Sequence, residues 1–476
     1  MSIKQTYISN NPKSLEKYAK ELLGKSLREV LGDQLVQTYS GKGKLGQLLE
    51  ELYFQYKPNS STKPDFEEAG VELKTTPLKK ILKGYVSKER LVFNIINYIE
   101  EHKKEFNTSS FWKKNNLLLL MFYLYEEDKL DIDYIFKIIR LWRFPAIDLK
   151  IIKDDWEKII SKIRAGKAHE ISEGDTLYLG ACTKGATSTS LRKQPFSDIL
   201  AMQRAFSLKS KYLNFIIEKS FAKEEIKIDY AQYDVILGEN NLSEPSSSYR
   251  KWDLNEIEPV VKEIDEYRKG ETFEGLIQRK FSLYIGKSEK EICKLLAIVI
   301  SSSKSKSYLV TREIVKAILG VTKNKIEEFE KADVEMKTIR LEKSGTLKES
   351  MSFAQIQYKE IIEEKWEDSY WFNTITKRFF FVVFQKNEND ELLLKKVCFW
   401  TMPFEDIKIA KNFWLDTKNK IINNNFEDFI KISDDRICHV RPKGADSNDK
   451  METISGSMEK KKCYWLNSSY IKRVIE

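Results

Sequence analysis

The sequence predicts an α/β protein built from two tandem copies of one domain. Three observations support this prediction: a ten-residue segment recurs in the second half, further echoes follow in order, and helical and strand-like apolar spacings alternate. A chain of 476 residues is long enough for two domains of roughly 200 residues, each with its own core. We expect the first domain at residues 1–223, a linker at 224–254 and the second domain at 255–476.

The clearest repeat joins residues 65–74, D-F-E-E-A-G-V-E-L-K, to residues 328–337, E-F-E-K-A-D-V-E-M-K. Further pairs occur in the same order in both copies, with offsets that stay between 263 and 258 residues: Gly24-Lys25-Ser26 with Gly286-Lys287-Ser288, Trp156 with Trp414, and Lys184-Gly185-Ala186 with Lys443-Gly444-Ala445. Chance explains one such pair easily, whereas an ordered series indicates an internal duplication. Between the copies, residues 238–248 are rich in Gly, Asn, Pro and Ser, which is typical of a linker.

Apolar spacing in the first copy mixes helical and strand-like periods, which indicates an α/β domain. The predicted helices are Leu15–Leu31, Leu45–Tyr56 and Asp148–Ile163. The predicted strands are Val71–Thr75, Leu91–Tyr98, Leu117–Tyr125 and Thr176–Cys182.

Composition limits the classes of function. The balance of 81 Lys and Arg against 72 Asp and Glu gives a net charge of +9, which is compatible with a polyanionic partner but supports it only weakly. The chain has three histidines, and its five cysteines form no C-x-x-C pair, which disfavours a zinc hydrolase. We find neither a signal peptide nor a membrane-spanning segment, so we expect a cytoplasmic protein without a membrane partner.

The repeated segment carries a plausible catalytic chemistry. On a strand, Glu72 and Lys74 point to the same face, and Gly70 allows a tight turn that brings Asp65 beside them. Two carboxylates make a hard-oxygen site for Mg²⁺, and a nearby lysine can orient water or stabilise negative charge. Glu50 could add a carboxylate from the preceding helix. These residues alone also fit a solvated strand edge of alternating charge.

The surrounding residues favour the catalytic interpretation. Residues 63–77, K-P-D-F-E-E-A-G-V-E-L-K-T-T-P, resemble the active-site segment of the MutH family, and residues 46–50, G-Q-L-L-E, resemble its glutamate-bearing helix. The resemblance implies that Glu50, Asp65, Glu72 and Lys74 are catalytic, with Asp65 and Glu72 on the metal. Thr108-Ser109 followed by Lys114 resembles the segment with a second catalytic lysine, although Lys113 is an alternative.

The same resemblance implies the fold and the reaction. MutH-like proteins share a restriction-endonuclease-like fold, need Mg²⁺ and act at GATC in double-stranded DNA. Two copies in one chain resemble the fused type II restriction endonucleases of this family. A strand-nicking mismatch-repair endonuclease and a non-catalytic DNA-binding protein remain the alternatives, and a DNA-dependent dimer stays open.

Family DNA-reading loops fall on basic segments of both copies. The DNA contacts implied by the resemblance are Lys184, Arg204, Ser207, Lys209 and Lys211 in the first copy, and Arg441, Lys443 and Trp465 in the second. The family's Arg-Pro-Lys is kept at residues 441–443 but replaced by Cys-Thr-Lys at residues 182–184. The family's tyrosine position holds Ser207 in one copy and Trp465 in the other, so the response to adenine methylation is not predicted.

The second copy is expected to bind GATC DNA without cutting it and to promote cleavage by the first. Glu328 is one methylene longer than Asp65, and Mg²⁺ demands tight octahedral geometry. At an offset of 259 residues, Lys114 is replaced by Asn373. We therefore predict an allosteric domain at residues 255–476.

Overall fold

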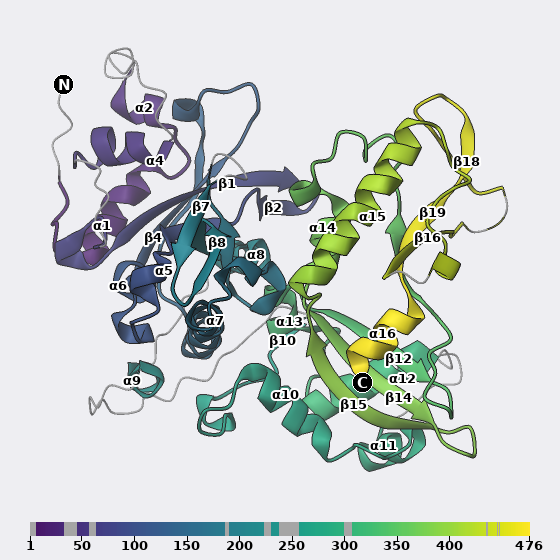
Figure 1. Cartoon of the computed structure of the whole chain (residues 1–476). Helices are drawn as coiled ribbons and strands as arrows, with labels where there is room; N and C mark the ends of the chain where they lie inside the picture. Colours follow the sequence, from purple (N-terminus) through teal and green to yellow (C-terminus); the bar gives the residue numbers. More distant parts are fainter. Residues whose placement is uncertain are drawn as a thin grey trace. The chain divides into compact units, whose positions relative to one another are not determined.

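The computed structural model describes residues 6–32, 45–56, 63–185, 190–222, 230–237, 257–298, 307–434, 437–444, 446 and 448–476. Contacts divide the chain into two compact units, one mainly from Met1–Ile171 and Asp175–Asp253, the other mainly from Leu254–Phe329 and Asp333–Glu476 (Figure 1). The predicted linker core, residues 238–248, lies outside the described residues. Within the wider predicted linker, the described residues form helix α9, Tyr230–Leu237, which packs on α7, Ala146–Arg164.

The first unit contains a mixed sheet of order β2-β1-β4-β5. Its strands are β1 Glu72–Ile81, β2 Gly84–Ser87, β4 Leu118–Leu124 and β5 Phe136–Trp142. The central pair, β1 and β4, is parallel, with Glu72 opposite Leu118. A second sheet of order β3-β9-β6 consists of β3 Leu91–Ile95, β9 Arg204–Leu208 and β6 Leu179–Thr183. The hairpin of β7, Leu191–Gln194, and β8, Ser197–Met202, lies between β6 and β9 in the chain.

Short helices cover one face of the β1–β4–β5 sheet. Helices α1 Pro12–Ala19, α2 Leu27–Leu31 and α4 Leu45–Leu48 gather at one side of this sheet (Figure 1). Their apolar side chains form one core with the strands, including Leu15, Leu48, Leu73, Leu119 and Phe136. The other helices of this unit are α5 Tyr98–Glu101, α6 Ser110–Asn115, α7 and α8 Ser210–Phe221. Helix α8 contacts β2 and β5.

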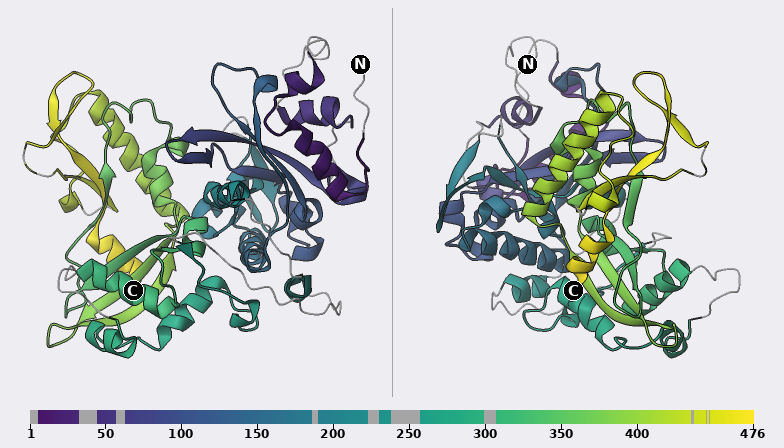
Figure 2. Two further views of the ribbon diagram at one scale, coloured as in Figure 1. Left: turned by 180° about the vertical axis from the view of Figure 1, so that it is seen from behind. Right: turned by 45° about the vertical axis from the view of Figure 1, so that its right-hand side comes forward.

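The second unit repeats this topology. Its first sheet has the order β12-β14-β15, from Glu335–Leu341, Phe379–Lys386 and Leu392–Trp400, and its second has the order β13-β19-β16, from Met351–Gln355, Lys462–Leu466 and Cys438–Pro442. The hairpin of β17, Lys450–Glu452, and β18, Met458–Lys460, projects beyond β16 and β19 and is yellow in both views of Figure 2. The short strands β10, Ile257–Glu258, and β11, Lys325–Ile326, pair in parallel.

The helices of the second unit are α10 Phe273–Ser282, α11 Glu289–Leu295, α12 Ser307–Leu319, α13 Glu327–Ala332, α14 Tyr370–Ile375, α15 Phe404–Ile422 and α16 Ser468–Ile475. No helix in the described part of the chain is long and apolar enough to cross a membrane.

The duplication extends to individual hydrogen bonds. The Tyr212 hydroxyl donates to Asp148 Oδ2 at 2.9 Å, and the Tyr470 hydroxyl donates to Asp406 Oδ2 at 2.7 Å. The tyrosine and the aspartate of the second pair each lie 258 residues after their counterparts in the first pair. The helices that carry the two aspartates, α7 and α15, each have 19 residues and each follow a proline. The predicted α/β class and the internal repeat are therefore confirmed.

The prediction of one continuous helix at Leu15–Leu31 is wrong. The segment breaks into α1, a 3₁₀ turn at Lys20–Leu22 and α2. Gly24 adopts a positive φ of 79°, which ends helical geometry, and Ser26 starts α2 with a capping box to Glu29. The same break returns in the second unit, where Gly286 has a φ of 82°.

The prediction of one α-helix over Leu45–Tyr56 holds only for its first turn. After α4 the backbone forms a π-helical turn at Leu49–Tyr53. Such turns are rare inside helices and are frequent at functional sites. This turn carries Glu50.

Candidate active site

Glu72 and Lys74 form a close ion pair at the start of β1. Lys74 Nζ lies 2.6 Å from Glu72 Oε1, and the Glu72 side chain is 1% exposed. Because the two residues are two apart on a strand, their side chains project from the same face, as the sequence predicts. A buried carboxylate paired with a lysine is typical of functional sites, although structural ion pairs share this feature.

A tight turn fixes Asp65 against Glu72. The Asp65 amide donates to Glu72 Oε2 at 3.0 Å, and the Leu73 amide donates to Asp65 Oδ2 at 3.0 Å. Gly70 closes the turn with a φ of 64°, a conformation that favours glycine. The two acidic side chains are thus held side by side by backbone hydrogen bonds.

Lys114 is the second lysine at this site. Its Nζ lies 3.5 Å from Glu72 Oε1, and its side chain is 12% exposed. Its neighbour Lys113 is exposed on the same helix, α6. The geometry therefore favours Lys114 over Lys113 as the lysine that faces the carboxylates.

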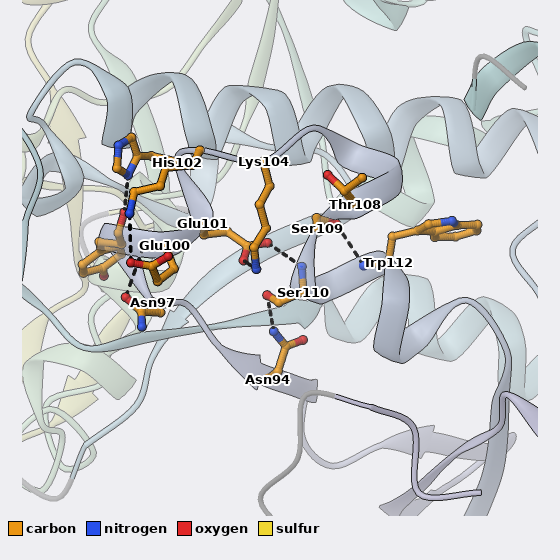
Figure 3. A network of polar contacts seen from close by, with 12 residues as sticks. Asn94, Asn97, Glu100, Glu101, His102, Lys104, Thr108, Ser109, Ser110 and Trp112 are labelled. Atoms are coloured by element: carbon orange, nitrogen blue, oxygen red, sulfur yellow. Dashed lines mark hydrogen bonds and ion pairs between the residues drawn. The ribbon is translucent and has the colours of Figure 1, made fainter. Parts of the chain in front are cut away.

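A polar network holds α6 in place, and Figure 3 shows its main contacts. At the start of α6, Ser109 Oγ accepts from the Trp112 amide at 3.0 Å, and Glu101 Oε1 accepts from the Ser110 amide at 2.9 Å. Asn94 on β3 donates to Ser110 Oγ at 2.8 Å. Because these contacts fix the first turn of α6, they also fix the direction from which Lys114 reaches the site.

The far end of α6 is tied to the same strand. Asn115 Nδ2 donates to Asn94 Oδ1 at 3.0 Å and to Phe111 O at 2.9 Å, and the Asn115 side chain is fully buried. Asn115 directly follows Lys114. The network therefore supports both ends of the short helix that carries this lysine.

Glu50 is electrostatically coupled to Asp65 and Glu72. Burial raises the pKa of Glu50 to about 7, and the negative charges of Asp65 and Glu72 raise it further while Lys74 and Lys114 oppose them. Burial also raises the pKa of Glu72 to about 7, against the lowering effect of Lys74. The charges of the pair predicted to bind metal therefore act on Glu50, which the π-helical turn carries.

These residues fit a divalent cation. Among the described residues, no group of three or more His, Cys, Asp or Glu side chains already stands at metal-binding spacing. However, Asp65 and Glu72 offer adjacent carboxylate oxygens, which are hard ligands. Repulsion by Asp65 raises the pKa of Glu72, and repulsion by both raises the pKa of Glu50. A bound cation would relieve this repulsion, so the donor set suits a hard metal ion such as Mg²⁺.

Comparison with known proteins identifies the family. A family model described as "DNA mismatch repair enzyme MutH" matches residues 54–155 and 320–412, one stretch in each unit. The chain is 36% identical to "Type II restriction enzyme Sau3AI" of Staphylococcus aureus over 511 aligned residues, covering 96% of this chain and 97% of that relative. The chain belongs to the MutH-like endonuclease family. It is also 28% identical to "DNA mismatch repair protein MutH" of Buchnera aphidicola subsp. Baizongia pistaciae (strain Bp), over 34% of this chain and 74% of that protein.

The second MutH-like domain keeps part of the site in a different environment. Lys337 Nζ lies 2.7 Å from Glu335 Oε1, so the pair that corresponds to Glu72 and Lys74 is present. Yet Glu335 is 33% exposed and Lys337 is 28% exposed. Water can reach this pair, whereas Glu72 is almost completely buried.

Glu328, which corresponds to Asp65, does not join Glu335. Its buried carboxylate accepts hydrogen bonds from the Val260 amide at 2.9 Å and from the Val261 amide at 3.0 Å. These contacts use both of its oxygens. In this domain the turn that presents Asp65 is replaced by helix α13.

The residue that corresponds to Lys114 differs from the prediction. Ser109 and Ser369 cap α6 and α14 in the same way, each accepting from the amide three residues later. They are 260 residues apart, so Lys114 corresponds to the buried Thr374 and not to Asn373. The offset of 259 residues is wrong by one at this helix, but the absence of a lysine at the corresponding position stands.

The predicted DNA-contacting residues of the first domain divide into two groups. Lys184 follows β6 and is exposed, and Lys211 is exposed on α8. Ser207 and Lys209 are buried, and Lys209 Nζ donates to Thr176 O at 2.6 Å. Arg204 is half-buried and donates to Ala181 O at 2.7 Å. The structure therefore does not bring Ser207 and Lys209 to the surface, because both belong to the interior side of the β3-β9-β6 sheet and its junction with α8.

The corresponding residues of the second domain lie together. Arg441 Cζ and Lys443 Nζ lie 5.3 Å and 5.6 Å from the centre of the Trp465 ring, and His439 stacks on that ring at 5.9 Å. The pairing of β16 with β19 places His439 opposite Trp465. Arg441 and Lys443 are exposed. This arrangement offers two cations and an aromatic side chain on one face.

Sequence reasoning missed Tyr56, Asn94, Glu101 and Asn115. Tyr56 is the last residue of a segment with helical apolar spacing, and this spacing predicts a core residue and no functional one. The other three are polar residues in short elements, and no motif marks them. Only the contacts within the folded domain connect them to the site.

Proposed function

We propose that the protein is a type II restriction endonuclease that makes Mg²⁺-dependent double-strand breaks at GATC in DNA. The observation that carries the proposal is the convergence of Asp65, Glu72, Lys74 and Lys114 in one MutH-like domain, with Lys74 and Lys114 both facing Glu72 Oε1. The relationship to the Staphylococcus aureus type II restriction enzyme over nearly the whole chain supports double-strand cleavage as the outcome.

In the proposed mechanism each side chain has a separate task. Asp65 and Glu72 would hold the metal, and Glu50 would supply a further carboxylate to it or to its water shell. A metal bound here polarises a phosphate oxygen and lowers the pKa of a bound water. Lys74 and Lys114 place positive charge where negative charge develops on the attacked phosphate, and Lys74 also orients water.

The second domain is proposed to bind GATC DNA and to promote cleavage by the first. Arg441, Lys443 and Trp465 support the binding role, because arginine and lysine suit phosphate and guanine contacts. The hydrogen bonds of Glu328 to backbone amides and the exposure of Glu335 support the absence of chemistry. We place the boundary between the domains in residues 224–254.

The test uses supercoiled plasmids with and without GATC, incubated with Mg²⁺ or EDTA. We expect linear DNA to accumulate only with GATC and Mg²⁺, while binding in EDTA or Ca²⁺ leaves the plasmid intact. Accumulation of nicked circles alone would identify a strand-nicking repair enzyme instead. Binding without any cleavage, in every metal tried, would identify a DNA-binding protein with structural carboxylates.

Methylated plasmid and sedimentation complete the experiment. Plasmid with adenine-methylated GATC sites shows whether Ser207 and Trp465 leave the enzyme able to respond to methylation. Sedimentation with and without a GATC duplex measures DNA-dependent dimer formation.

A further inference from the structure

Tyr56 lies between the two segments that present the acidic side chains. Its amide donates to Glu50 O at 2.9 Å, directly after the π-helical turn. Its ring packs edge-on against Phe66, the residue after Asp65, with the ring centres 5.2 Å apart. The Tyr56 side chain is therefore fixed by neighbours of both Glu50 and Asp65.

The Tyr56 hydroxyl is buried and, among the described residues, has no hydrogen-bond partner. Burial raises the pKa of Tyr56 far above its usual value, and the charges of Asp65, Glu50 and Glu72 raise it further. The hydroxyl thus stays neutral, and the charges of all three carboxylates act on it. A buried hydroxyl without a partner costs roughly 1–3 kcal/mol, and a water or an ion bound beside it is one way to satisfy it.

The second domain provides an internal comparison. At the offset of 263 residues that relates Asp65 to Glu328, Tyr56 corresponds to Leu319, a buried residue of α12. Phe66 corresponds to Phe329, which is also buried. The second domain therefore keeps the phenylalanine but lacks the tyrosine hydroxyl. In the same domain, the Glu328 carboxylate accepts hydrogen bonds from backbone amides.

We propose that Tyr56 is a positioning residue of the metal site, and that its hydroxyl holds a water molecule in the coordination shell of the divalent cation bound by Asp65 and Glu72. The inference rests on the metal-dependent function proposed above. A neutral tyrosine hydroxyl can accept a hydrogen bond from that water and donate its own proton to a neighbouring carboxylate oxygen. Outer-shell partners of this kind orient metal ligands and influence metal affinity.

The experiment compares Tyr56→Phe with a matched control, Tyr53→Phe. Tyr53 lies in the same π-helical turn, but its hydroxyl donates to Tyr18 O at 2.7 Å. Ca²⁺ and Mg²⁺ binding is measured by calorimetry without DNA, and the melting temperature is measured without metal. We expect Tyr56→Phe to weaken metal binding about tenfold or more without lowering the metal-free melting temperature. Tyr53→Phe should lower the melting temperature and leave metal affinity unchanged.

Cleavage provides a second readout. Tyr56→Phe should raise the Mg²⁺ concentration needed for half-maximal cleavage, while DNA affinity in EDTA stays at the wild-type value. If the wild type binds metal, Glu72→Gln does not, and Tyr56→Phe binds as tightly as the wild type, this inference is wrong and the proposed function survives. If the wild type binds no divalent cation at all, both fall.

Discussion

At the scale of single residues, Glu72 is the centre of the site. One of its oxygens accepts from the Asp65 amide, and the other faces the ammonium groups of Lys74 and Lys114. Such a buried carboxylate is stable only with partners, and here its partners are the other groups assigned to the chemistry. Replacing Glu72 therefore disturbs the whole cluster, whereas replacing a lysine removes one positive charge.

We predict that Asp65→Ala, Glu72→Ala and Lys74→Ala each reduce cleavage of GATC plasmid at least about a hundredfold, because each removes a metal ligand or a charge at the reacting phosphate. DNA affinity in Ca²⁺, measured by fluorescence anisotropy, should change little. The matched control is Glu67→Ala, since the Glu67 side chain is 61% exposed in the same segment. Near wild-type cleavage by any of the three variants would refute the assignment.

The acidic cluster should make metal binding depend on pH. Burial raises the pKa values of Glu50 and Glu72 to about 7, so in the metal-free protein both groups stabilise the fold at low pH and lose this contribution as the pH rises through about 7. A cation binds the ionised forms. We therefore predict that Ca²⁺ raises the melting temperature more at about pH 8 than at about pH 6.

The control for this prediction is Glu72→Gln, which cannot ionise. In this variant the effect of Ca²⁺ on the melting temperature should be small, and its change between the two pH values should shrink. An equal effect of Ca²⁺ at both pH values in the wild type would show that these carboxylates do not bind the metal.

At the scale of elements, the six-residue helix α6 owes its position to polar contacts. Isolated helices of this length are unstable in water, so α6 depends on its cap at Ser109 and on its bonds to neighbouring segments. Asn94 and Asn115 connect it to β3. At the offset of 260 residues, the second domain has Ala354 and Ile375 in their places, beside Thr374 where the first has Lys114.

We predict that the double substitution Asn94→Ala with Asn115→Ile lowers cleavage about tenfold or more, because a displacement of about 1 Å in a catalytic group can cost up to a hundredfold. The rate is measured at saturating Mg²⁺ and DNA. Lys113→Ala, on the exposed face of α6, should leave the rate unchanged.

A double-mutant cycle shows whether the network acts through Lys114. In a Lys114→Ala background, the double substitution should have little further effect on the rate. An effect of full size in that background would mean that Asn94 and Asn115 influence the reaction by another route.

The sequence predicts the long, strongly periodic elements well and the short ones poorly. Residues 148–163 show helical spacing and fall within α7, and Leu117–Tyr125 brackets β4, because each buries a continuous apolar face. Strand β1 runs past Pro77 to Ile81, although proline disfavours strands. Pro77 stands just before the first residue paired with β2, Leu78, and its carbonyl still accepts a hydrogen bond from the Lys88 amide.

The residues of the candidate site also differ in how well the sequence predicts them. Asp65, Glu72 and Lys74 are predictable because their spacing within one short segment already implies a shared location. Glu50 is suggested by its place on the preceding helical segment and by family resemblance, whereas the π-helical turn that carries it gives no simple sequence signal. The burial of Ser207 and Lys209 depends on the pairing of β9 with both β3 and β6, which no local pattern reveals.

At the scale of the whole molecule, one fold appears twice with different residues at the candidate site. Both domains keep the tyrosine–aspartate hydrogen bond, the capped helices and the parallel central strands. They differ at the positions of Tyr56, Asp65 and Lys114, where the second domain has Leu319, Glu328 and Thr374. The differences concentrate at the candidate site, which is the expected pattern when one copy of a duplicated enzyme is freed from catalysis.

We predict that Glu335→Ala with Lys337→Ala leaves cleavage within about twofold of the wild-type rate, whereas Arg441→Ala with Lys443→Ala lowers it about 5-fold to 150-fold, which corresponds to a coupling of 1–3 kcal/mol. Rates are measured on plasmids that carry one or two GATC sites. Loss of cleavage in the first double variant as complete as in Glu72→Ala would show that the second domain cuts DNA.

The hydrogen bonds of Glu328 also bear on how the two halves can evolve. A mutation from Glu328 to aspartate restores the family residue, but the shorter side chain loses its reach to the Val260 and Val261 amides in a buried position. On the proposal that the second domain does not cut DNA, the first substitution toward a second nuclease centre therefore weakens the domain before it can confer a new reaction. Because a less stable domain unfolds more often, selection disfavours the substitution of Glu328 by aspartate. A lineage with glutamate at position 328 therefore tends to keep it, even where a second nuclease centre would be useful.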